Sequence, residues 1–327
     1  MLQALKKNPK FTPRRGPVVL AILDGVGYGK YADGDAVKLA RTPVLDAFMK
    51  NCPVTKLKAH GTAVGMPSDD DMGNSEVGHN AIGCGRVFSQ GAKLVEEAVE
   101  SKKLFAGEVW KKLIENVKQH DSTLHFLGLF SDGNVHSNIN HLKAMVEEAK
   151  KAGVKHVRIH ALLDGRDVPE TSALEYIDPF EAFLAELNKD GFDARIASGG
   201  GRMVITMDRY GANWDMVRKG WEVHVHGCGE MFRNAHEAVE ALRKKTGAID
   251  QDLPPFVISD DGRTPVGAMK DHDSVIFFNF RGDRALEITK AFEAEQLAEF
   301  DRGIRPDVMY AGMMEYDGDL HAPKLYL

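Results

Sequence analysis

The sequence contains few cysteines and no long hydrophobic segment. Its three cysteines, Cys52, Cys84 and Cys228, lie far apart and form no CxxC pair, so we expect neither a disulfide framework nor a zinc knuckle. This pattern is typical of a reducing compartment, and we expect a cytoplasmic protein. No apolar run approaches about 20 residues, so the sequence predicts no membrane span.

A strong charge of one sign is also missing. The formal net charge is −6 over 327 residues, which gives no support for a nucleic-acid or membrane surface. Residues 1–16 carry five lysines and arginines without an apolar segment after Met1, so we expect a solvated basic arm rather than a secretory signal. Apolar residues make up 43% of the chain, which allows a sizeable core. We expect a monomer.

Short apolar segments alternate with helical patterns along the chain. The patterns predict strands at 17–23, 123–129, 155–163, 192–198, 274–280 and 307–313. They predict helices at 43–50, where Thr42-Pro43 is a typical helix start, and at 138–152, 172–189 and 234–246. This alternation predicts an α/β fold with a mostly parallel sheet and helices on both faces.

Polar residues with ligand-binding chemistry follow the predicted strands directly. They are Asp24, His136, Arg166, Asp167, Arg202, Arg281 and Arg284. Ligands of open α/β sheets bind outside the carboxyl ends of the strands. We therefore expect these loops to meet at one rim of the sheet.

Arginine is the most frequent of these rim residues. Guanidinium groups bind phosphate and carboxylate in a bidentate manner and stay charged. One arginine alone is usually a surface or salt-bridge residue, but five on one rim indicate a small ligand with several negative charges, such as a phosphorylated organic acid. The five are Arg166, Arg202, Arg209, Arg281 and Arg284. His136 is either incidental or a hydrogen-bond donor or proton acceptor for that ligand.

The run from Asp69 to Asn80 places Ser75 where a loop turns into a helix. The serine is either a helix N-cap or a nucleophile whose phosphate is stabilised at the positive end of the helix. Asp24 either caps a turn or binds a divalent metal that activates the serine. The Asp69-Asp70-Asp71 run is a solvated loop or a metal site. His79, one helical turn after Ser75, is a structural residue or a base.

Seven segments together resemble the cofactor-independent phosphoglycerate mutases, which belong to the alkaline-phosphatase-like metalloenzymes. The segments are Leu23-Asp24-Gly25-Val26-Gly27, Met72-Gly73-Asn74-Ser75-Glu76-Val77-Gly78-His79-Asn80, Ser131-Asp132-Gly133-Asn134-Val135-His136-Ser137, Asp164-Gly165-Arg166-Asp167, Gly201-Arg202, Met207-Asp208-Arg209 and Phe278-Asn279-Phe280-Arg281-Gly282-Asp283-Arg284. The chain is similar to the plant and trypanosomatid branch. Three features depart from the bacterial pattern: the wider spacing of Arg202 and Arg209, Tyr210 in place of an acidic residue, and Asn134 in place of a glycine.

The resemblance implies a role for each matching position. Ser75 is expected to become phosphoserine, and Asp24 and Ser75 to bind one of two divalent metal ions, manganese or else magnesium or cobalt. Arg281 and Arg284 are expected to hold the phosphate, and Arg166, Arg202, Arg209 and His136 the rest of the substrate. Asp167 is expected to carry protons between the glycerate hydroxyls. The implied reaction is the glycolytic interconversion of 3-phosphoglycerate and 2-phosphoglycerate without 2,3-bisphosphoglycerate.

The resemblance also implies a domain organisation. We expect residues 17–89 to be the N-terminal part of an alkaline-phosphatase-like metal domain, 90–320 an α/β phosphotransferase domain, and 321–327 the start of a return to the metal domain. The remaining metal ligands of the family are not found after Arg284, so the chain is expected to be the N-terminal portion of a mutase. Two alternatives stay open: a related phosphatase or phosphopentomutase, and an inactive fragment that binds phosphoglycerate.

Overall fold

The computed structural model describes residues 6–23, 25–89 and 91–327. The chain divides into two compact units, Met1–Leu57 and Lys58–Leu327. Its first unit, as far as it is described, contains the helices α1 (Ala36–Leu39) and α2 (Pro43–Asn51). The helix predicted at 43–50 is therefore confirmed, with Pro43 in its first turn.

The strand predicted at 17–23 is wrong for the described residues of this segment. Val18, Val19 and Leu20 are 66–86% exposed and have no strand geometry. A strand needs a neighbour for its backbone hydrogen bonds, and the described part of the first unit holds no second strand. Asp24, which follows this segment, lies outside the described residues.

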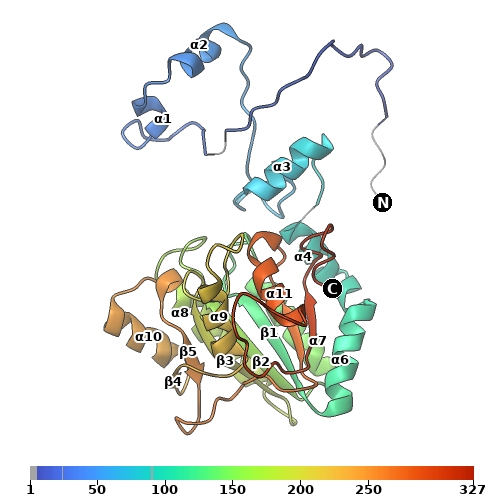
Figure 1. Ribbon diagram of the computed structural model, residues 1–327, viewed down its shortest axis with the longest axis vertical. Coiled ribbons are helices and arrows are strands. Elements are labelled where there is room, and N and C mark those ends of the chain that lie inside the picture. Colours follow the sequence, from blue (N-terminus) through green and yellow to red (C-terminus); the bar gives the residue numbers. More distant parts are fainter. Residues whose placement is uncertain (1–5, 24, 90) are drawn as a thin grey trace. The chain divides into compact units, whose positions relative to one another are not determined.

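The second unit is built on one seven-stranded sheet (Figure 1). In chain order the strands are β1 (Thr123–Leu129), β2 (His156–Leu163), β3 (Asp193–Gly201), β4 (Glu230–Phe232), β5 (Phe256–Ile258), β6 (Ser274–Phe277) and β7 (Met309–Gly312). The spatial order is β4-β5-β3-β2-β1-β6-β7. All neighbours run parallel except β3 and β5, so the predicted α/β class with a mostly parallel sheet is confirmed.

Helices cover both faces of this sheet (Figure 1). One apolar core receives side chains from α4 (Ala92–Glu100), α6 (Glu108–His120), α7 (Ile139–Lys151), α8 (Ala173–Leu187) and α10 (Ala235–Thr246). The core on the other face receives side chains from α9 (Trp214–His224) and α11 (Leu286–Glu293). Leu124 and Phe126 of β1 belong to the first core and Leu127 and Leu129 to the second, as expected for a strand buried on both sides.

The remaining elements of the second unit are α3 (Ser75–Cys84), α5 (Lys103–Ala106) and the 3-10 turns Gly61–Val64, Asp250–Asp252 and Gly282–Arg284. No helix in the described ranges combines the length and apolarity that crossing a bilayer requires.

Candidate functional site

The loops that leave β1, β2, β3 and β6 carry most of the residues singled out in the sequence. These four strands are adjacent and parallel, so their carboxyl ends lie along one rim of the sheet. His136 follows β1, Arg166 and Asp167 follow β2, Arg202 follows β3, and Arg281 and Arg284 follow β6. The structure therefore brings these side chains to the expected rim.

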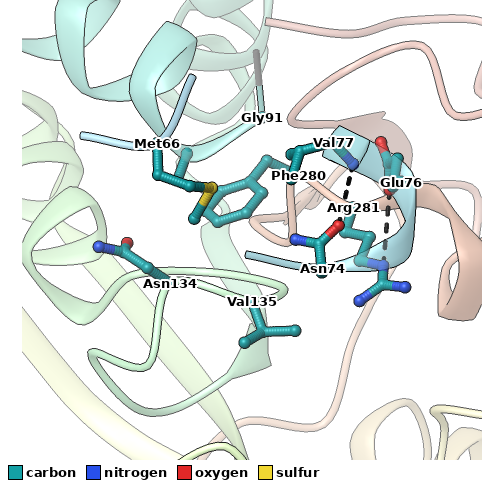
Figure 2. A pocket seen from close by; sticks show the side chains of 10 residues that line it. Met66, Asn74, Glu76, Val77, Gly91, Asn134, Val135, Phe280 and Arg281 are labelled. Atoms are coloured by element: carbon teal, nitrogen blue, oxygen red, sulfur yellow. Dashed lines mark hydrogen bonds and ion pairs between the residues drawn. The ribbon is translucent and has the colours of Figure 1, made fainter. Parts of the chain in front are cut away.

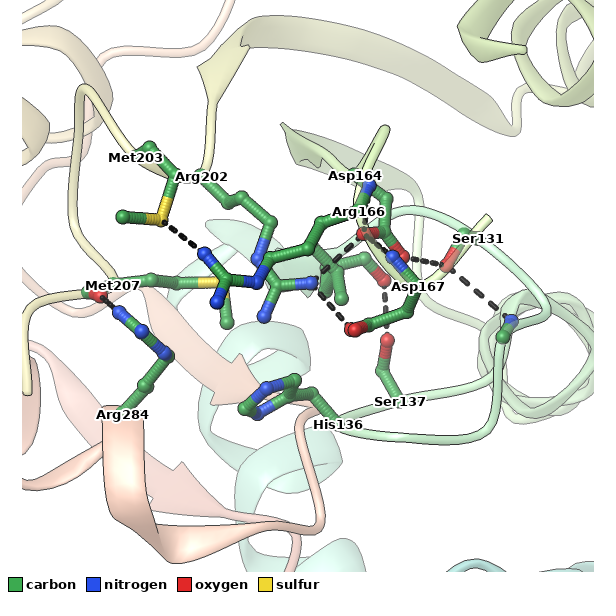
Figure 3. A network of polar contacts seen from close by, with 12 residues as sticks. Ser131, His136, Ser137, Asp164, Arg166, Asp167, Arg202, Met203, Met207 and Arg284 are labelled. Carbon is green, nitrogen blue, oxygen red and sulfur yellow. Dashed lines mark hydrogen bonds and ion pairs between the residues drawn. The ribbon is translucent and has the colours of Figure 1, made fainter. Parts of the chain in front are cut away.

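Arg202 forms the buried centre of the rim (Figure 3). Its Nη1 donates to Asp164 Oδ1 over 2.8 Å and also to Asp167 Oδ2. The Ser131 hydroxyl donates to the second Asp164 oxygen over 2.6 Å. Arg202 and Asp164 are both almost fully buried, and a buried charge needs such partners because it has lost its water. This network fixes the loops after β1, β2 and β3 against one another.

Asp164 also shapes the loop that presents Arg166. Its Oδ1 accepts the backbone N–H of Arg166 over 3.2 Å and that of Asp167 over 3.0 Å. These bonds close a turn in which an aspartate side chain accepts from the backbone two and three residues further on. The Arg166 guanidinium projects toward Met203, with 3.9 Å from Nη1 to the sulfur. Arg166 is therefore held by its backbone while its charge stays accessible.

Asp283 links two further arginines, Arg281 and Arg209, with the histidine. Its Oδ2 lies 3.0 Å from Arg281 Nη2 and 3.4 Å from Arg209 Nη2. Its Oδ1 lies 3.5 Å from His136 Nδ1, and neither of these two atoms has a hydrogen-bond partner in the described structure. A buried polar atom without a partner is costly. His136 Nδ1 and Asp283 Oδ1 therefore stay available for hydrogen bonds with a ligand.

The rim carries concentrated positive charge. Burial first, and then the charges of four surrounding arginines, hold the pKa of His136 well below its ordinary value, so the ring is neutral at pH 7. Burial, and then the charges of other arginines led by Arg202, also lower the pKa of Arg284. Arg284 donates from Nη1 to the Met207 carbonyl oxygen over 2.7 Å. Such crowding of like charges is relieved by a bound anion.

Ser75 is the first residue of α3, and the N-cap is Asn74 rather than the serine. The Asn74 side chain accepts the backbone N–H of Val77 over 3.1 Å. Figure 2 shows that Asn74 and Glu76, which flank Ser75, line the same small pocket as Arg281. Glu76 Oε2 lies 3.5 Å from Arg281 Nε. The serine thus lies in the helix turn that faces the arginine rim.

Two other candidates near Ser75 have structural contacts. His79 Nδ1 lies 2.7 Å from the Ser75 carbonyl oxygen. Because a carbonyl oxygen only accepts hydrogen bonds, Nδ1 carries a proton and cannot take one up as a general base would. Asp69 accepts from the amide and hydroxyl of Thr62, and Asp71 from those of Ser68. The acidic run therefore stabilises turns.

Several functional residues were missed in the sequence. Asp283 bridges three rim residues, Asp164 holds Arg202, and Glu76 approaches Arg281. Each lies in one of the seven segments that resemble the mutases, one or two residues from a candidate site residue. This proximity is the sequence feature that could have indicated a role in the site. The pairing itself depends on loops far apart in the sequence.

Comparison with known proteins identifies the relatives of this chain. A model of the BPG-independent PGAM N-terminus family matches residues 95–318. The chain is 56% identical to a probable 2,3-bisphosphoglycerate-independent phosphoglycerate mutase of Leptospira interrogans, over 99% of this chain and 59% of that protein. It is 49% identical to the 2,3-bisphosphoglycerate-independent phosphoglycerate mutase of Trypanosoma brucei brucei, over 97% of this chain and 58% of that protein.

A solved structure agrees with the sequence comparison. It is the Leishmania mexicana phosphoglycerate mutase at low cobalt concentration, which matches with a TM-score of 0.89 and 48% identity over 93% of this chain and 56% of that one. The chain spans a little under three fifths of the length of these curated relatives. The resemblance seen in the sequence is confirmed, and the chain belongs to the BPG-independent PGAM N-terminus family.

Proposed function

We propose that this chain supplies the phosphoglycerate site and the serine nucleophile of a cofactor-independent phosphoglycerate mutase of glycolysis. The observation that carries the proposal is the crowding of arginines at the rim, where burial first and then the neighbouring arginines lower the pKa values of His136 and Arg284. A ligand with a phosphate and a carboxylate would match the several guanidinium groups of this rim, because such groups bind both kinds of anion. The names of the relatives support the same reaction.

The rim contains cations that the protein itself does not neutralise. Within the described residues, Arg166 contacts the Met203 sulfur and Arg284 the Met207 carbonyl oxygen, rather than a carboxylate. Arg202, by contrast, is held by Asp164 and Asp167. Arg166 and Arg284 are thus proposed to bind ligand directly, together with Arg209, Arg281 and His136, while Arg202 mainly orders the rim.

The proposed chemistry is a phosphoryl transfer through Ser75. The serine oxygen forms a bond to phosphorus as the glycerate oxygen leaves and gains a proton, giving phosphoserine and bound glycerate. The glycerate reorients, its other hydroxyl takes the phosphoryl group back, and the serine proton is restored. Asp167 is proposed to carry the protons, since its carboxylate lies at the rim, where it pairs with Arg202. Positioning and charge stabilisation dominate such transfers.

The helix end assists the phosphorylated serine. Ser75 is at the first position of α3, where backbone N–H groups point outward and the helix dipole is positive. A phosphate on this residue is stabilised there and lies next to Glu76, the neighbour of Arg281.

We also propose dependence on divalent metal ions, manganese first and magnesium or cobalt as alternatives. The solved relative is described at low cobalt concentration, and such ions would lower the pKa of the serine hydroxyl. The described residues do not form this centre, since no group of three histidine, cysteine or carboxylate side chains is placed to hold a metal. Asp24 is proposed as a ligand, within a metal domain that includes residues 17–89.

An enolase-coupled assay with added Mn²⁺ or Co²⁺ tests the reaction. Formation of 2-phosphoglycerate that is lost in Ser75→Ala would support the proposal. Release of inorganic phosphate without isomerisation would instead identify a phosphatase.

Binding without turnover is a second candidate for this chain, since its described residues place no group of three metal-ligating side chains together. Calorimetry with 3-phosphoglycerate alongside the assay separates the two. A chain that neither binds nor converts 3-phosphoglycerate contradicts both.

A further inference from the structure

A chain of buried hydrogen bonds crosses the sheet beneath the rim. It begins at Asp273, whose Oδ2 lies 3.0 Å from His125 Nε2, and His125 Nδ1 lies 2.9 Å from His160 Nε2. His160 Nδ1 lies 2.7 Å from the Ser198 hydroxyl oxygen. All four residues are at most 3% exposed, so water does not replace any of these bonds.

The chain ends at the loop that carries rim arginines. Ser198 Oγ lies 2.8 Å from His224 Nδ1 on α9, and His224 Nε2 lies 3.1 Å from Thr206 Oγ1. Thr206 is fully buried and lies between Arg202 and Arg209. A register shift of the β2–β3 pair after Ile159 aligns His160 with Ser198, as bulges do when they redirect side chains.

Donor and acceptor rules give this chain a single direction when the three rings are neutral. The Asp273 carboxylate only accepts, so His125 Nε2 donates and His125 Nδ1 accepts from His160 Nε2. Ser198 then donates to His160 Nδ1, and His224 Nδ1 donates to Ser198. His224 Nε2 is left as an acceptor, which the Thr206 hydroxyl fills. Burial lowers the pKa of His224 to about 3, in agreement with a neutral ring.

Thr206 itself has an unfavourable backbone conformation. Its φ is 68°, in the left-handed region that β-branched residues rarely adopt and that persists only where the surroundings enforce it. Helix α9 helps to enforce this conformation, because Thr206 N donates to the Met216 carbonyl oxygen over 2.9 Å. A Cβ on Gly220 would lie 2.1 Å from Thr206 Oγ1, so α9 approaches the threonine as closely as a glycine permits.

We propose that Thr206 and His224 are positioning residues for the phosphoglycerate site. The buried chain holds Thr206, the next residue Met207 presents the carbonyl that holds Arg284, and Arg209 follows two residues later. Losing the Thr206 hydroxyl would leave His224 Nε2 without its donor and remove the side-chain contact of this loop with α9, while the backbone bond to Met216 stays. The inference depends on the proposed function for its ligand.

Calorimetry with 3-phosphoglycerate on the Thr206→Val and Thr206→Ser variants tests the inference. Valine keeps the branched shape without the hydroxyl, and we expect about tenfold weaker binding, the size of one lost hydrogen bond. Serine restores the hydroxyl and should restore the affinity. The matched control is Thr289→Val, which removes a buried hydroxyl bonded to Tyr310 over 2.9 Å and should leave the affinity unchanged. Equal affinity in Thr206→Val and the wild-type protein would overturn the inference, as would equal losses in both valine variants.

A measurement on the wild-type protein needs neither variant nor ligand. Nitrogen-15 NMR of the imidazole rings should show His224 as a single tautomer with its proton on Nδ1, and His160 with its proton on Nε2. Protonation of His224 on Nε2, or a mixture of tautomers, would overturn the directed chain. If wild-type protein shows these tautomers but does not bind 3-phosphoglycerate, the proposed function fails and the hydrogen-bond chain stands.

Discussion

Replacing Arg202 by methionine should destabilise the second unit strongly. The guanidinium is 1% exposed and is the cation of Asp164 and Asp167. Removing one member of a buried ion pair costs about 3–5 kcal/mol, because the remaining charge is buried without compensation. Asp164 keeps the Ser131 hydroxyl and two backbone N–H groups, so we expect the lower end, about 3 kcal/mol.

Tryptophan fluorescence during urea unfolding measures this effect in the second unit alone. All three tryptophans of the chain, Trp110, Trp214 and Trp221, lie in that unit. The control is Arg218→Met, which removes a 36% exposed arginine paired with Asp215 and Glu222 and should cost at most about 1 kcal/mol.

A second substitution sharpens the test of Arg202. Adding Asp164→Asn to Arg202→Met removes the uncompensated charge and should recover part of the lost stability. If Arg202→Met costs no more than Arg218→Met, the rim is not ordered by the buried ion pair and the reasoning is refuted.

Three further predictions concern the cap, the buried histidine and the rim. Asn74→Ala should lower stability by about 1 kcal/mol because it removes the cap of α3, whereas Ser75→Ala should abolish phosphoserine in a mass-spectrometric trap. Burial lowers the pKa of His141 from 6.5 to about 4. Between these two pH values the unfolded state therefore binds a proton that the folded state does not. The free energy of unfolding should therefore fall by about 1.4 kcal/mol per unit as pH falls through that window, and His141→Leu should remove this part of the slope in urea titrations. Arg284→Met should weaken calorimetric binding of 3-phosphoglycerate and make it less sensitive to salt; an unchanged salt dependence would contradict a direct contact.

The long elements of the fold could be predicted because their patterns are local. Thr123–Leu129 matches the predicted strand residue for residue, since a strand buried on both faces is largely apolar along its length. Strands β4 and β5 were missed because three residues carry no periodicity. Helix α6 was missed although Trp110, Leu113, Ile114 and Val117 have helical spacing and are all buried.

The site was predictable at the level of the rim but not of its pairs. Arg202 and Arg281 both follow strands, and the topology alone places them together. Burial of Arg202 and partial exposure of Arg166 depend on how the loops pack, which no local pattern encodes. The histidine chain from His125 to His224 is likewise invisible in the sequence, because its members lie on separate strands and a helix.

The most direct test of the central claim is a calorimetric titration of the chain with 3-phosphoglycerate at low and high salt. An arginine rim that binds a phosphate and a carboxylate predicts saturable one-site binding that weakens as salt increases. Glycerate, which lacks the phosphate, should bind more weakly. Absence of binding, or equal affinity for 3-phosphoglycerate and glycerate at both salt concentrations, would contradict the claim that this rim is the phosphoglycerate site.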